Sequence, residues 1–176
     1  MPVVKVKRLP EDFCVEELTD LTPARGGTFA LYRLRKTGLG TLEAIEAVQR
    51  RWELHRRRLS WGGLKDKHAV TSQYLTIHRG PQRGLQQGPL SLEFLGWLDR
   101  PFQPGDIRGN RFDITLRTLS QEALDRALEA LPEVQTAGIP NYFDDQRFGS
   151  VGVSGEFIAE PWIRGDYERT LWLALA

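Results

Sequence analysis

Short segments in which apolar and polar residues alternate are the feature that most limits the folds open to this chain. Alternation with a period of two places every second side chain on one face, as in a β-strand with one buried face. The cleanest example, residues 111–117, places Phe112, Ile114 and Leu116 on one face. Further strands are predicted at residues 3–7, 29–34, 71–78 and 90–98, separated by turns that contain Gly or Pro.

Helical periodicity is confined to three segments. A helix is predicted over residues 41–54, with Thr41 as its N-cap and cations in its last turn. A second helix should follow the N-cap Ser120 and end before Pro132, because proline interrupts the hydrogen bonding of a helix. A third helix begins after Asp166. Strands and helices together predict an α+β fold.

Composition excludes several other classes of protein. The chain has 176 residues, enough for one full domain or for one domain and the start of another. Its mean hydropathy of −0.40 and its 40% hydrophobic residues are typical of globular proteins, and no apolar run approaches the roughly 20 residues of a membrane-spanning helix. The single cysteine, Cys14, excludes an internal disulfide and a multi-thiolate zinc site and favours a cytoplasmic location. With only three scattered histidines, no metal site is expected.

Charge is unevenly distributed along the chain, although the formal net charge is only +1. Residues 1–120 hold 20 Lys and Arg against 13 Asp and Glu, whereas residues 121–176 hold 4 against 10. A basic N-terminal part is typical of proteins that bind a polyanion such as nucleic acid. The most basic run, residues 50–58, has two interpretations of equal weight: cations that favour the end of a helix dipole, or a phosphate-binding patch.

Asp66 lies between Lys65 and Lys67 in a glycine-containing turn that leads into a predicted strand. The two cations favour an ionised carboxylate and could also bind a phosphate group. The alternative is an exposed turn in which the charges alternate by chance.

Two further segments combine polar and aromatic residues. Asn110 precedes Phe112 at the start of a predicted strand, and this ring could belong to the core or could stack on an unpaired base. The segment of residues 139–149 is a loop rich in aromatic residues, in which Arg147 could contact a ligand or pair with Asp144 or Asp145.

Taken together, these segments resemble the tRNA pseudouridine-13 synthases, the TruD family. The resemblance rests on four motifs that occur in family order across residues 7–149. The motifs are Pro10-Glu11-Asp12-Phe13 followed by Val15-Glu16-Glu17, the run Gly-x-Lys-Asp-Lys-x-Ala-Val-Thr-x-Gln from Gly63 to Gln73, Gly109-Asn110-x-Phe112, and Pro140-Asn141-Tyr142-Phe143-x-x-Gln146-Arg147-Phe148-Gly149.

The resemblance implies a role for individual residues. Asp66 matches the catalytic aspartate of the family, and Lys7 matches a basic residue of its active site, with Arg8 as the alternative. Asn110 and Phe112 match its active-site asparagine and phenylalanine. Asp144 replaces the glycine that usually follows Asn-Tyr-Phe in the family. This difference bears only on the backbone conformation of that loop. The remaining substrate-binding candidates are Lys65, Lys67, Gln73, Asn141 and Arg147.

The resemblance also implies a fold, a reaction and a partner. The fold is a mixed, mostly antiparallel sheet with flanking helices, with a catalytic domain over residues 1–150 and the start of an inserted domain, cut short, over residues 151–176. The reaction isomerises uridine 13 in the D-arm of tRNA and needs no cofactor. An aspartate could add to C1′ of the ribose or remove a proton from C2′, and both routes stay open.

Two other functions compete with this one. The chain could be an RNA-binding module without catalysis, in which residues 50–58 would bind phosphates. It could equally be a truncated synthase that is inactive. A weaker alternative is a protein-interaction domain, although no protein partner and no membrane contact are evident from the sequence.

Overall fold

The computed structural model describes residues 5–139 and 155–175. The chain forms two compact units, residues 1–124 and 125–176. The domain boundary predicted at residue 150 lies outside the described residues and stays a prediction. None of the helices in the described ranges is long and apolar enough to cross a membrane.

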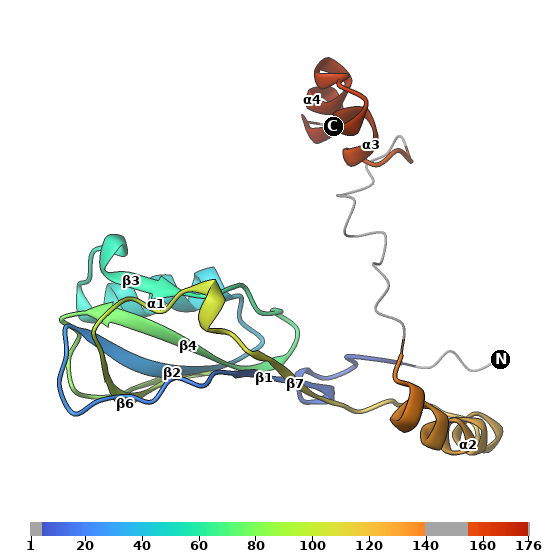
Figure 1. Cartoon of the computed structure of the whole chain (residues 1–176), viewed down its shortest axis with the longest axis horizontal. Helices are drawn as coiled ribbons and strands as arrows, with labels where there is room; N and C mark the ends of the chain where they lie inside the picture. Colours follow the sequence, from blue (N-terminus) through green and yellow to red (C-terminus); the bar gives the residue numbers. More distant parts are fainter. Residues whose placement is uncertain (1–4, 140–154, 176) are drawn as a thin grey trace. The chain divides into compact units, whose positions relative to one another are not determined.

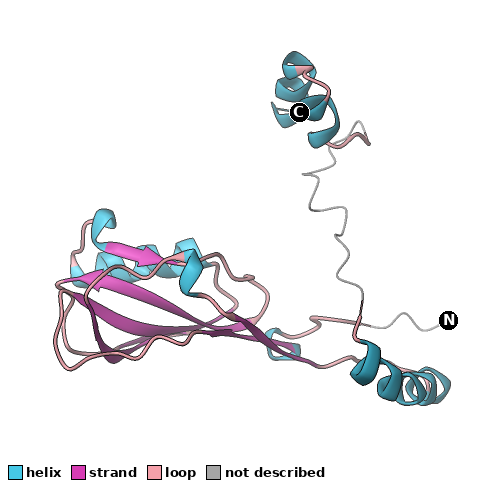
Figure 2. Cartoon of the chain, in the orientation of Figure 1, coloured by secondary structure: helices cyan, strands magenta, loops and turns pink. Residues whose placement is uncertain are grey.

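A seven-stranded mixed sheet forms the first unit (Figure 2). Its strand order is β5-β6-β2-β4-β1-β7, with β3 paired to β4 beside this path. Only the β1–β4 pair is parallel among the pairs of named strands. The α+β fold with a mostly antiparallel sheet is therefore confirmed. The strands are β1 (Phe13–Leu18), β2 (Phe29–Thr37), β3 (Leu59–Trp61), β4 (Val70–His78), β5 (Leu85–Gln87), β6 (Leu90–Leu98) and β7 (Gly109–Ile114).

Helix α1 (Thr41–Trp52) covers one face of the sheet (Figure 1). Its apolar stripe, predicted from the sequence, includes the buried residues Ile45 and Val48. They pack against the alternating inward side chains of β2, β4 and β6 to form the core. The N-cap is Gly40 rather than Thr41, and the Glu43 carboxylate accepts the hydrogen bond of the Gly40 N–H at 2.8 Å.

One edge of β4 is shared by two strands. β1 pairs with the N-terminal part of β4, with Val15 opposite Thr71, whereas β3 pairs with its C-terminal part. The chain that leaves β3 must therefore pass beside β1 before it enters β4. This topology brings the loop of residues 62–69 to the end of β1 and its neighbour β7.

Of the strand predicted at residues 3–7, the structure describes residues 5–7, and these do not form a strand. Lys5 makes one isolated bridge to Arg117, and Lys7 has a left-handed backbone with a φ of 58°. A left-handed residue ends an extended segment. The strand that pairs with β4 and β7 is instead β1, after the short 3-10 helix η1 (Pro10–Asp12).

β7 is an edge strand, and this changes the interpretation of its alternating side chains. It ends at Ile114 rather than at residue 117. Phe112 is 54% exposed and Ile114 is 46% exposed, so the interpretation of this face as core is wrong. The strand lies at the end of the sheet, beyond the part that α1 covers (Figure 1).

The helices near the C-terminus are α2 (Gln121–Ala137), α3 (Ala159–Ile163) and α4 (Tyr167–Leu175). The prediction that α2 ends before Pro132 is wrong, because the helix continues through this proline. A proline removes one backbone hydrogen bond of a helix. The high helix propensity of the residues on both sides can offset that loss. The predicted cap of α4 is confirmed, since the Asp166 carboxylate accepts the hydrogen bond of the Arg169 N–H at 3.0 Å.

Candidate active site

A cavity of about 200 Å³ lies where the loop between β3 and β4 meets the ends of β1 and β7. Four residues that were predicted as site residues line it: Lys65, Asp66, Asn110 and Phe112. The other lining residues are Val15 and Leu64. The cavity thus places a carboxylate, an amide and an aromatic ring around one small volume, although they come from segments more than 40 residues apart in sequence.

The Asp66 carboxylate forms an ion pair with Lys7, with 2.9 Å between Oδ2 and Nζ. The Lys7 ammonium also lies 3.9 Å from the centroid of the Phe13 ring. A cation between a carboxylate and a ring face is held in place by both. Of the two basic residues that the sequence left open, Lys7 rather than Arg8 makes this contact. The Asp66 side chain remains 55% exposed, so a ligand can reach it.

The segment that carries Lys7 is anchored by a second ion pair. The buried Asp12 carboxylate accepts hydrogen bonds from the Arg117 guanidinium at 2.8 and 2.9 Å and from the Leu9 N–H at 3.0 Å. The hydrogen bond from Arg117 is the main reason why the pKa of Asp12 is lowered. This clamp fixes the N-terminal segment beside the chain that follows β7.

The two lysines that flank Asp66 are paired with other carboxylates. The Lys65 ammonium binds the Glu17 carboxylate at 2.7 Å, and this pair is almost completely buried. The Lys67 ammonium binds Glu43 at 2.8 Å on the surface, and this hydrogen bond lowers the pKa of Glu43. The expectation that both lysines act directly on Asp66 is therefore replaced by a different arrangement, in which Lys7 provides the cation.

A third lysine lies beneath the loop. The Lys36 side chain is buried, and its Nζ donates hydrogen bonds to the backbone carbonyl oxygens of Asp66 at 2.8 Å and Lys65 at 3.3 Å. Burial lowers the pKa of Lys36 to about 8, and the nearby Asp66 carboxylate opposes part of this shift. Lys36 therefore fixes the backbone of Asp66 and, through it, the position of the carboxylate.

Thr41 and Gln73 complete the support of the loop. The Thr41 hydroxyl accepts the hydrogen bond of the Lys65 N–H at 2.9 Å and lies 2.9 Å from Gln73 Oε1, to which it donates. The Gln73 amide nitrogen donates to the Gly63 carbonyl at 3.1 Å. Gln73 is fully buried below the loop and does not line the cavity. Its predicted contact with substrate stays a prediction, and the geometry gives it a positioning role.

Three residues that support the site were not predicted to do so from the sequence: Lys36, Thr41 and Glu17. A signal was available for two of them, because the period of two places Lys36 on the same face of β2 as Tyr32 and Leu34. It likewise places Glu17 on the same face of β1 as the buried Val15. A charged residue on an apolar face needs a partner. Which partner it has depends on the order of the strands.

The buried ammonium of Lys36 predicts a specific pH dependence of stability. An unfolded lysine has a pKa of about 10.4. Between the folded pKa of about 8 and this value, the unfolded chain binds a proton that the folded chain does not bind. The free energy of unfolding of the native chain should therefore rise with pH in this interval, relative to that of Lys36→Met, by up to about 3 kcal/mol. Denaturant titrations across the interval measure this difference, and parallel curves for the two proteins would contradict it.

Two predicted site residues, Asn141 and Arg147, lie outside the described residues. Within residues 5–139 and 155–175, no group of three or more His, Cys, Asp or Glu side chains is placed to hold a metal ion.

Comparisons with known proteins point to one family. The family model described as tRNA pseudouridine synthase D (TruD) matches residues 3–176. A relative from Methanocaldococcus jannaschii named "Probable tRNA pseudouridine synthase D 2" is 37% identical over 98% of this chain and 40% of its own length. A second, named "tRNA pseudouridine synthase D", from Aquifex aeolicus, is 33% identical over 96% of this chain and 45% of its own length.

A solved structure extends the agreement to the fold. A crystal structure from Methanosarcina mazei that carries the TruD name has a TM-score of 0.80 and 28% sequence identity to this chain, and the match covers 97% of this chain and 41% of that one. The chain thus spans less than half the length of the relatives it matches. The family model, the sequence relatives and the fold agree, and the chain belongs to the tRNA pseudouridine synthase D (TruD) family.

Proposed function

We propose that this chain contributes the catalytic site of a tRNA pseudouridine synthase that isomerises uridine 13 in the D-arm of tRNA, with Asp66 as the catalytic carboxylate. The observation that carries the proposal is the cavity lined by Asp66, Asn110 and Phe112. The target base is stacked in folded RNA and must be flipped out to reach a carboxylate on the protein surface. A tRNA substrate also favours a cytoplasmic location.

The reaction breaks the bond between N1 of uracil and C1′ of the ribose and forms a bond between C5 and C1′. The Asp66 carboxylate adds to C1′, or it removes a proton from C2′ to give a glycal. The detached uracil then turns, and C5 forms its bond to C1′. In the first route this step displaces the Asp66 carboxylate from C1′, and in the second Asp66 returns the proton to C2′. The proton on C5 leaves, and N1 gains a proton. Bonds and electrons balance without an oxidant or reductant, so no cofactor is part of the proposal.

The residues around Asp66 have distinct roles in this proposal. Phe112 is more than half exposed and can stack on the uracil ring, a contact worth about 1 to 3 kcal/mol. The Asn110 amide can donate to and accept from the edge of uracil while the base turns. Lys7 keeps the carboxylate oriented through the 2.9 Å ion pair.

The experiment that tests the proposal is release of tritium from tRNA labelled at C5 of uridine, because the reaction expels this hydrogen. Release above background, with pseudouridine at position 13 of the product, supports the proposal. Salt-dependent tRNA binding without release would instead support an RNA-binding module that lacks catalysis.

Lys7 and Arg8 provide a matched pair of variants for the same assay. Lys7→Met should lower the rate of tritium release by about 10²-fold, because the carboxylate loses the contact that orients it. Arg8→Met removes the same charge one residue away and should leave the rate unchanged. Equal rates for the two variants would contradict the role of Lys7.

A further inference from the structure

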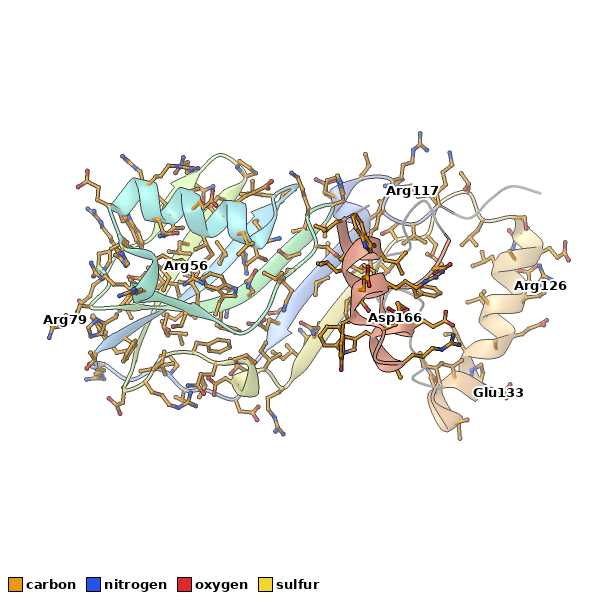
Figure 3. All side chains as sticks on the ribbon, turned by 90° about the horizontal axis from the view of Figure 1, so that it is seen from above. Arg56, Arg79, Arg117, Arg126, Glu133 and Asp166 are labelled. Carbon is orange, nitrogen blue, oxygen red and sulfur yellow. The ribbon has the colours of Figure 1, made fainter. Side chains whose placement is uncertain are left out.

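A second feature of the first unit is a cluster of exposed arginines at the end of α1 opposite to the active site. Arg51 lies in the last turn of α1, Arg56 and Arg57 follow in the 3-10 helix η2 (Arg56–Arg58), and Arg79 and Arg83 lie in the connection between β4 and β5. Figure 3 shows Arg56 and Arg79 at the same end of the sheet. We call these five residues the distal arginine cluster.

A cavity of about 360 Å³ is lined by two of these arginines. Arg51 and Arg83 line it from two segments more than 30 residues apart, together with Trp52 and residues 84–86. Two guanidinium groups at one concave surface can bind one or two phosphate groups through paired hydrogen bonds.

The arginines of the cluster are not neutralised by the protein. In the part of the chain that the structure describes, the ion pairs recorded include those of Arg100, Arg108 and Arg117, but none joins a member of the distal arginine cluster to a carboxylate. Arg56 lies 4.0 Å from the centroid of the Trp61 ring, which holds its guanidinium without removing its charge. Like charges placed together at an exposed surface favour an anionic partner.

The helix dipole explains only part of this arrangement. Cations in the last turn of a helix are favourable, which applies to Arg51. Arg79 and Arg83 belong to a different segment, and the structure ties that segment to η2. Arg58 donates hydrogen bonds to the carbonyl oxygens of His78 at 3.0 Å and Arg79 at 2.9 Å. These hydrogen bonds bring the arginines of α1 and η2 to the same surface as those in the connection between β4 and β5.

The position of the cluster relative to Asp66 determines what it could contact. Thr41, the first residue of α1, binds the backbone of Lys65 beside Asp66, whereas Arg51 lies ten residues further along the helix. At a rise of 1.5 Å per residue these ends are about 15 Å apart. The cluster therefore cannot contact a uridine whose ribose lies at Asp66, but it can contact RNA that continues from that nucleotide.

We propose that the distal arginine cluster binds the phosphate backbone of a helical segment of tRNA away from the target uridine, with Arg51 and Arg83 as the central contacts. This proposal rests on the proposed function for the identity of the RNA. The cluster positions the substrate and does not take part in the chemistry, so it should contribute to affinity for long RNA and not for short RNA.

The test compares Arg51→Gln/Arg83→Gln with a control, Arg108→Gln/Arg164→Gln, which removes two charges that the protein pairs with Asp20 and Glu160. Affinity is measured by fluorescence anisotropy over a range of salt concentrations. One RNA is a full tRNA transcript, and the other is a short single strand with the target uridine, too short to reach the cluster. For tRNA, the cluster variant should bind several-fold more weakly. The slope of log affinity against log salt concentration should be shallower by about 2.

For the short RNA, the cluster variant should bind like the native chain, and Arg51→Lys/Arg83→Lys should restore most of the salt dependence for tRNA. An unchanged salt dependence for tRNA, an equal loss in the control, or an equal loss with the short RNA would each overturn the proposal. The result of this binding test does not depend on whether the proposed function is correct. If the native chain releases no tritium, the cluster variant can still bind tRNA more weakly than the native chain. If the native chain is active, the cluster variant can still bind tRNA with native affinity.

Discussion

Replacing Asp66 with Asn is expected to lower the rate of tritium release from C5-labelled tRNA by about 10⁴-fold or more. The amide is close in size to the carboxylate but can neither add to C1′ as an anion nor remove the proton from C2′. Because the Asp66 side chain is 55% exposed and its main partner is the surface residue Lys7, the free energy of unfolding should change little. Affinity for tRNA should remain within a few-fold of the native value.

The matched control is Asp20→Asn, which also replaces an exposed, ion-paired aspartate and lies outside the cavity. Its rate of tritium release should equal that of the native chain. Native-like release by Asp66→Asn would remove Asp66 from the mechanism. Release that falls only because tRNA no longer binds would assign Asp66 to binding.

The second large effect is expected on stability, at the buried ion pair below the active-site loop. Glu17→Gln should lower the free energy of unfolding by about 3 kcal/mol, because the ammonium of Lys65 then remains buried without a counter-charge. The amide oxygen of Gln can still accept the hydrogen bond that the Tyr74 N–H donates at 2.9 Å, so the loss reports the ion pair. Denaturant titration at neutral pH measures this loss.

A double variant separates the ion pair from other effects of the substitution. Glu17→Gln/Lys65→Met removes both charges and keeps the volume of the Lys65 side chain, and it should be more stable than Glu17→Gln alone. An equal or greater loss in the double variant would show that the charge of Lys65 is not the cause. Glu16→Gln, at an exposed pair with Arg111, is the surface control and should change stability by less than about 1 kcal/mol.

The elements that form the core, α1, β2, β4 and β6, were predictable from their periodic apolar residues. β6 was predicted with its observed bounds, and β4 and α1 were predicted to within two residues. β1 was missed because the polar residues Glu16 and Glu17 interrupt its apolar pattern, and Glu17 is buried only because Lys65 binds it. Phe112 was open to two interpretations, since the alternation of β7 does not show whether the strand lies at the centre or the edge of the sheet.

The sequence by itself determined the fold class and most of the strands. Its resemblance to a family predicted Asp66, Asn110 and Phe112 as site residues, and the structure places these three at one cavity. Periodicity and short motifs depend on neighbours along the chain, so they can be recognised without a structure. Only the tertiary structure decided that Lys7 pairs with Asp66 and that Lys36 supports the loop from below. These contacts join residues 59 and 30 positions apart. They follow from the order of strands in the sheet, which no local pattern specifies.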